Sequence, residues 1–269
     1  MSSQRPDELP EADTQAARRS RWRRFSPSMG WRAFWSEIVI VVLGVVIALA
    51  ANEAVEQLNW RSKVRDADAR LAVDVESLFF YSAEQFATQP CINAQLDALA
   101  HRVLASGATL TPAPVIVESN YPTRPSFVIR MPTKPWQFAV WEALVANGTA
   151  THFSAAWQDR YNGIAGNAAM ARSMRIEANQ IIGRLRALSY PMPLDAGARR
   201  DFLVDIEGLR RHSTSTMVTG GNLIRSITGA GIAPRAEAVD DYLADSGTVQ
   251  FCKQQHLPIA EWRDYKGQR

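Results

Sequence analysis

The side chains best suited to chemistry in this 269-residue sequence are spread along the chain and form no recognisable motif. None of the four histidines has a partner at the spacing of a helical metal site, and there is no HExxH pattern. No serine stands in a G-x-S-x-G elbow, and the glycine pairs lack the strand-then-helix context of a phosphate loop. The sequence therefore predicts no catalytic residue, cofactor-binding residue or metal ligand. The histidines are His101, His152, His212 and His256.

Glu142 is the acidic residue that most invites a functional interpretation, because it follows Trp141 in a predicted helix. Inside a helical bundle it could form a buried ion pair with an arginine such as Arg160. The alternative is a carboxylate that faces solvent, which is the usual place for glutamate.

The two cysteines, Cys91 and Cys252, do not have the paired spacing of a zinc finger or an iron–sulfur site. In an oxidising compartment they could form a disulfide, and otherwise they would be two separate buried thiols. The sequence leaves both alternatives open.

The composition predicts a folded protein, with 46% hydrophobic and 21% charged residues. The net charge is only +3, but the arginines are concentrated before the one long apolar run. A nucleic-acid-binding protein would spread its basic residues over a folded face, so no nucleic-acid partner is expected. We expect residues 1–30 to be a disordered cytoplasmic tail that contacts anionic lipid headgroups. The arginines of this tail are Arg18, Arg19, Arg21, Arg23 and Arg24.

The apolar run from Ile38 to Ala51 predicts a transmembrane helix over residues 31–52. Aromatic residues typical of a membrane interface extend it upstream, so the stretch from Trp31 covers about 31 Å as a helix. The alternatives are a signal peptide cleaved after Ala50 and a buried core helix. Gly44 and Ala48 form a small-x-x-x-small pair that could seat a second transmembrane helix.

The excess of arginine upstream of the run predicts a cytoplasmic N-terminus. Residues 53–269 then form the periplasmic domain of a single-pass protein of a bacterial inner membrane. The bilayer is thus the first expected partner, and an envelope protein or a second copy of the chain is the next.

Helical periodicity dominates this domain and predicts a mainly α fold, a helical bundle with at most a small β-hairpin. No glycine or proline interrupts residues 53–89, which predict a stalk helix, and Pro90 suits the first turn of a second helix. Six prolines then predict a loop over residues 108–135. Further helices are expected up to Asn147, up to Pro191, after an N-cap at Asp195, and from Pro234 to Leu243.

Two motifs resemble those of a family of uncharacterised bacterial single-pass membrane proteins of unknown function. The first is the anchor pattern Glu37-Ile38, Gly44-Val45 and Ile47-Ala48-Leu49, and the second is Trp141-Glu142-Ala143-Leu144 with Gly148, followed by Tyr161. The resemblance covers about a third of the chain and implies the single crossing and the helical domain. It implies no reaction.

With no chemical motif, the first functional hypothesis is a membrane-anchored scaffold or accessory subunit that binds another envelope protein. The alternative is a ligand-sensing bundle that signals through a partner membrane protein, since only about 30 residues are expected in the cytoplasm. An enzyme with a site assembled from scattered Glu, His and Arg residues is the third hypothesis.

Overall fold

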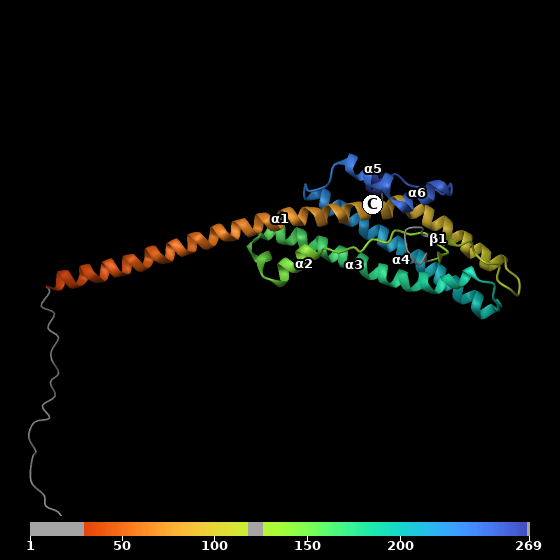
Figure 1. The fold of residues 1–269 in the computed structure, drawn as a ribbon, viewed down its shortest axis with the longest axis horizontal. Coiled ribbons are helices and arrows are strands. Elements are labelled where there is room, and N and C mark those ends of the chain that lie inside the picture. The colour runs from red at the N-terminus through yellow and green to blue at the C-terminus, as the bar shows by residue number, and fades with distance from the viewer. Residues whose placement is uncertain (1–29, 118–125, 268–269) are drawn as a thin grey trace, which may run out of the picture. The chain divides into compact units, whose positions relative to one another are not determined.

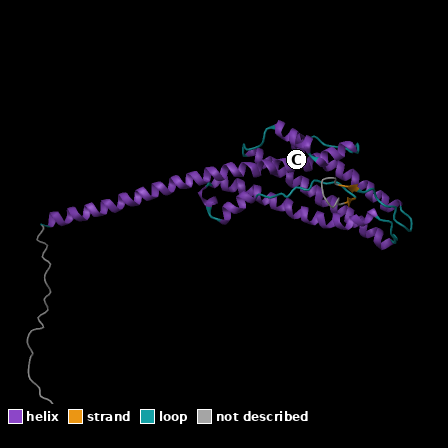
Figure 2. Ribbon diagram, viewed as in Figure 1, coloured by secondary structure: helices purple, strands orange, loops and turns teal. Residues whose placement is uncertain are grey.

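The computed structural model describes residues 30–117 and 126–267, and the arginine cluster of the predicted tail lies outside them. The fold is mainly α, as the sequence predicts (Figure 2). The helices are α1 (Trp31–Ala105), α2 (Ala139–Ala146), α3 (Ala155–Leu185), α4 (Ala196–Gly229), α5 (Ala236–Asp245) and α6 (Gly247–Gln254). Short 3-10 helices are η1 (Thr149–His152), η2 (Arg186–Ser189) and η3 (Trp262–Gly267).

The chain divides into two units, Met1–Glu56 and Gln57–Arg269. In the first unit, the described residues are Gly30 and the N-terminal part of α1. Its large apolar side chains are exposed, and Ile40 and Leu49, for example, are 69% and 65% exposed. In the described part of the chain, α1 alone is long and apolar enough to cross a membrane. By length and composition it is compatible with a single-pass anchor.

The second unit is built on three long helices, the C-terminal part of α1 with α3 and α4. Two hydrophobic clusters form its core, one around Leu71, Leu78 and Tyr161 and the other around Ile92, Leu96 and Leu185. The buried stripe of α3 follows the predicted spacing of three and four residues.

The connection between α3 and α4 ends at the predicted N-cap. The carboxylate of Asp195 accepts a hydrogen bond of 2.8 Å from the backbone N–H of Ala198, so the cap prediction is confirmed.

The structure differs from the prediction at Pro90, where no second helix begins. Helix α1 continues through Pro90 to Ala105 (Figure 1). A proline inside a helix removes one backbone hydrogen bond and costs about 3 kcal/mol. Buried residues on both sides, Phe86 and Ile92 among them, offset this cost by packing into the core.

The proline-rich segment contains one small hairpin, in which β1 (Ile116–Val117) pairs antiparallel with β2 (Ser126–Phe127). Before the hairpin, the backbone N–H of Leu110 donates to Met192 over 2.8 Å, and that of Ala113 donates to Leu188 over 2.8 Å. The segment is thereby fixed against the connection between α3 and α4. After the hairpin, it lies along α3 and forms one wall of a cavity.

Candidate functional site

A cavity of about 490 Å³ lies between α3 and the extended segment of residues 127–135. This volume is in the range that holds one small ligand. Exposed lining residues, Thr133 and Asn179 among them, open it to the surface. We name it the basic groove because four of its lining side chains are cationic. They are Arg130, Lys134, Arg172 and Arg175.

Helix α3 supplies one wall of the groove from a single face. Arg172, Ile176, Asn179 and Ile182 follow each other at spacings of four, three and three residues. Arg175 lies three residues after Arg172 and four before Asn179, so all five side chains lie on one side of the helix.

The opposite wall is held by hydrogen bonds to its backbone. Gln95 of α1 accepts from the N–H of Arg130 at 2.8 Å and donates to the carbonyl of Arg130 at 3.1 Å. At the other end, the Nε of Arg172 donates to the carbonyl of Trp136 at 3.4 Å. The wall is therefore fixed to α1 and to α3.

A buried carboxylate balances part of the positive charge. Glu84 of α1 is 1% exposed and accepts hydrogen bonds from Tyr242 at 2.8 Å and from Ser246 at 2.6 Å. The Nζ of Lys134 lies 3.8 Å from the same carboxylate. A buried charge needs such partners, because an unpaired one would be strongly destabilising.

The charge of Glu84 also acts on the arginines of the groove and on Tyr242. Burial lowers the pKa of Arg175 to about 10, and the negative charge of Glu84 opposes this shift. Burial lowers the pKa of Arg130 in the same way, again opposed by Glu84. For Tyr242, burial and then the charge of Glu84 raise the pKa of the hydroxyl. At neutral pH both arginines are cations and Tyr242 is a hydrogen-bond donor.

Arg172 pairs with Glu142 at 2.6 Å, which corrects the pairing with Arg160 that the sequence suggested. Arg160 instead lies over the ring of Trp157 at 4.9 Å. Arg172 reaches Glu142 because α2 packs against α3 at that position, and the pair is not buried, since the Glu142 side chain is 52% exposed. Glu142 thus lies at the rim of the groove and faces solvent.

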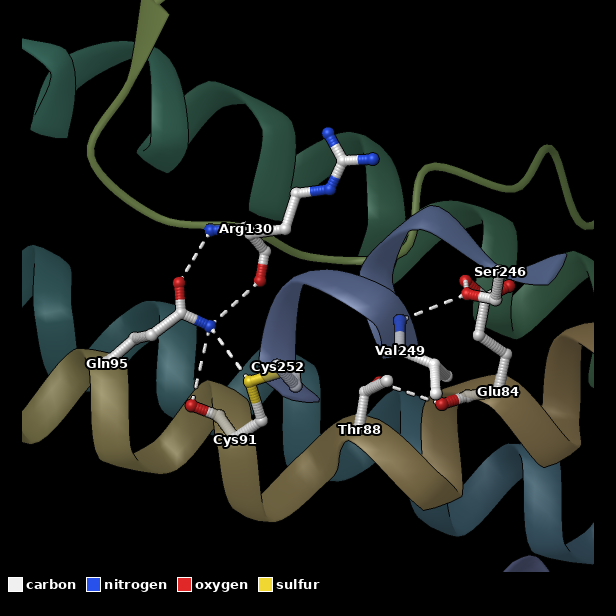
Figure 3. The surroundings of a disulfide bond; sticks show 8 residues. All are labelled: Glu84, Thr88, Cys91, Gln95, Arg130, Ser246, Val249 and Cys252. Atoms are coloured by element: carbon white, nitrogen blue, oxygen red, sulfur yellow. Dashed lines mark hydrogen bonds between the residues drawn. A yellow bond between two sulfur atoms is a disulfide. The ribbon is translucent and has the colours of Figure 1, made fainter. Parts of the chain in front are cut away.

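A disulfide joins Cys91 of α1 to Cys252 of α6, beside Gln95 (Figure 3). Both cysteines are 0% exposed, and their Cα atoms are 6.0 Å apart. Gln95, which holds the backbone of Arg130, also lies 3.5 Å from the Sγ of Cys91. In Figure 3 the guanidinium of Arg130 extends away from the disulfide.

The start of α6 completes this arrangement. Ser246 caps α6 by accepting from the N–H of Val249 at 3.2 Å and donates to Glu84. At Gly247 a Cβ atom would lie 3.0 Å from the Nη2 of Arg130. Glycine at this position therefore leaves room for the guanidinium.

The other sequence candidates are not among the residues that line the groove. His152 stacks on Trp60 with ring centroids 3.7 Å apart, and the Nε2 of His212 lies 3.4 Å from Glu177. Among residues 30–117 and 126–267, no three His, Cys, Asp or Glu side chains converge as a metal site would require. Gly44 and Ala48 are exposed on α1, and their contact with a partner helix stays a prediction.

Sequence reasoning missed Glu84 and the four basic residues. The signal for Glu84 was a run of polar residues in α1, which the structure buries between Leu78 and Ile92. Ser82, Gln85 and Gln89 are polar residues on the buried face of the helix, where apolar residues would otherwise be expected. The hydroxyl of Ser213 of α4 forms hydrogen bonds with both Gln85 and Gln89. No comparable signal marks Lys134 or Arg175, because isolated basic residues are usually solvated.

Comparison of the chain with models of known protein families, with curated proteins and with solved structures found no match. The resemblance to the uncharacterised single-pass family therefore rests on the quoted motifs alone.

Proposed function

We propose that this protein is a single-pass protein of a bacterial inner membrane whose periplasmic domain binds a small anionic ligand in the basic groove. The observation that carries the proposal is the gathering of Arg130, Lys134, Arg172 and Arg175 around one open cavity. The proposal follows the ligand-sensing alternative drawn from the sequence, in which a partner membrane protein receives the signal.

Three features support the membrane topology. The N-terminal part of α1 is long and apolar enough to cross a bilayer. The arginines that precede it favour a cytoplasmic N-terminus. The disulfide between Cys91 and Cys252 suits an oxidising compartment such as the periplasm.

The charges of the groove favour an anion. Four cationic side chains face two carboxylates, Glu84 and Glu142, so the site has two more positive than negative charges. Bidentate guanidinium groups and a lysine ammonium are the donors that proteins use for carboxylates and phosphates. Because Glu84 is held by two hydroxyl donors as well, Lys134 remains able to bind a second anion.

The proposal is tested with two ligands of the same shape and different charge, benzoate and benzamide. The full chain in nanodiscs of zwitterionic lipid is heated with each compound, because a ligand that binds the folded state raises its melting temperature. We expect benzoate to stabilise the protein more than benzamide, and the difference to shrink in Lys134→Gln. Equal effects of the two compounds on the wild type would refute anion binding.

The scaffold or accessory-subunit hypothesis stays a prediction that co-purification in mild detergent can test. Recovery of a stoichiometric envelope partner that binds equally well to the wild type and to Lys134→Gln would favour it over ligand binding.

A further inference from the structure

The basic groove has two chemically different ends. Its direction follows from two contacts, because Arg172 of α3 bonds the carbonyl of Trp136, whereas β2 contacts η2 just beyond the end of α3. The segment of residues 127–135 therefore runs antiparallel to α3.

This direction sorts the lining residues into two groups. Lys134 lies opposite the part of α3 that carries Arg172 and Arg175, so three of the four cations gather at one end, while Arg130 lies between Ile129 and Met131. Phe127 and Ile129 lie opposite the part that carries Ile182 and Gly183, so the other end is apolar. From Arg172 to Ile182 is ten residues of helix, or about 15 Å.

The middle of the groove also carries apolar side chains, beside the polar groups of Arg130, Thr133 and Asn179. Met131 is buried on one wall, and Ile176 on the other wall is 55% exposed, so its aliphatic side chain is open to a ligand. A site for an inorganic anion alone would have no use for this apolar length.

We infer that the natural ligand is a single-chain anionic amphiphile, an inference that rests on the proposed function. Its acidic head lies between Lys134 and Arg175, and its alkyl chain runs over Ile176 toward Ile182. The head is a carboxylate or a phosphate, since guanidinium and ammonium groups bind both.

Chain length is the variable that tests this inference. Butyrate, hexanoate, octanoate and decanoate are titrated calorimetrically into the full chain in nanodiscs, and the heats from empty nanodiscs are subtracted. Each buried methylene should tighten binding about fourfold until the apolar end is filled. Decanol should bind more weakly than decanoate because it lacks the charge.

Two failures are distinguishable. If all four carboxylates bind with the same affinity, the amphiphile inference is wrong and anion binding stands. If no carboxylate binds, both are wrong. Decyl phosphate is titrated as well, and whichever of decyl phosphate and decanoate binds more tightly identifies the acidic head group that the site prefers.

Variants of solvent-accessible residues separate the two ends without threatening the fold. Lys134→Gln should weaken the binding of decanoate and leave the binding of decanol unchanged. Ile176→Ser should weaken the binding of decanoate and leave the binding of butyrate unchanged. The matched control is Val218→Ser, an aliphatic residue of α4 that is 50% exposed and lies outside the groove. An effect of Val218→Ser equal to that of Ile176→Ser would overturn the assignment of the chain to the groove.

Discussion

Replacing Glu84 with glutamine should make the protein less stable and improve its binding of anions. The variant keeps the size of the side chain but removes the charge. Tyr242 donates to Oε2 of Glu84 and Ser246 to Oε1, so the single amide oxygen of glutamine can accept from one of them, and its NH2 group must donate to the other hydroxyl. A hydrogen bond to a charged group contributes about 1.5–3 kcal/mol and a neutral one about 0.5–1.5 kcal/mol. With two such bonds, the loss in the free energy of unfolding is about 2 kcal/mol. For a domain of this size, that lowers the melting temperature by roughly 4–8 °C.

The same change leaves Lys134 and the arginines of the groove without a buried counter-ion. Benzoate should therefore bind several-fold more tightly to Glu84→Gln than to the wild type. Thermal unfolding followed by circular dichroism and calorimetric titration with benzoate measure the two effects on one preparation.

Glu142→Gln is the matched control, because Glu142 pairs with Arg172 at the exposed rim. An exposed pair contributes less than about 1 kcal/mol, so the melting temperature of this variant should hardly change. Weaker benzoate binding by Glu84→Gln, or an unchanged melting temperature, would refute the role given to Glu84.

Three further predictions concern the parts of the fold that support the groove. Replacing both Cys91 and Cys252 with serine removes a covalent link across 161 residues. By chain entropy this costs about 5 kcal/mol of unfolding free energy and should lower the melting temperature by roughly 10–20 °C. An unchanged melting temperature would contradict the stabilising role of the disulfide. Gly247→Ala should weaken benzoate binding by displacing the guanidinium of Arg130, while thermal stability stays close to that of the wild type; equal affinity in the two proteins would argue against this contact. Because the folded state raises the pKa of Tyr242, the neutral hydroxyl stabilises the fold fully below the ordinary pKa of 10.0, and this stabilisation is lost as the pH rises above that value. In Tyr242→Phe the melting temperature should therefore fall less steeply between neutral and alkaline pH than in the wild type. An equally steep fall in both proteins would contradict this prediction.

The helices of this protein could be predicted from its sequence because their buried stripes follow regular spacing. The stripe of α3 and the Asp195 cap are examples, and both depend on residues close together in the chain. Pro90 was misread because local propensity places proline at a helix start, whereas packing on both sides carries α1 through it.

The groove could not be predicted, because its residues meet only in the folded chain. Lys134 and Arg175 are 41 residues apart, and neither has a local pattern that distinguishes it from a solvated cation. The partner of Glu142 was missed for the same reason, since only the packing of α2 on α3 decides between Arg160 and Arg172.

The most direct test of the groove is to locate a bound amphiphile in a crystal structure of the full chain. Decanoate brominated at its terminal carbon marks the end of its chain by anomalous scattering. We expect bromine beside Ile182 and the carboxylate between Lys134 and Arg175. Bromine outside the groove, or a ligand in the reverse orientation, would contradict this expectation.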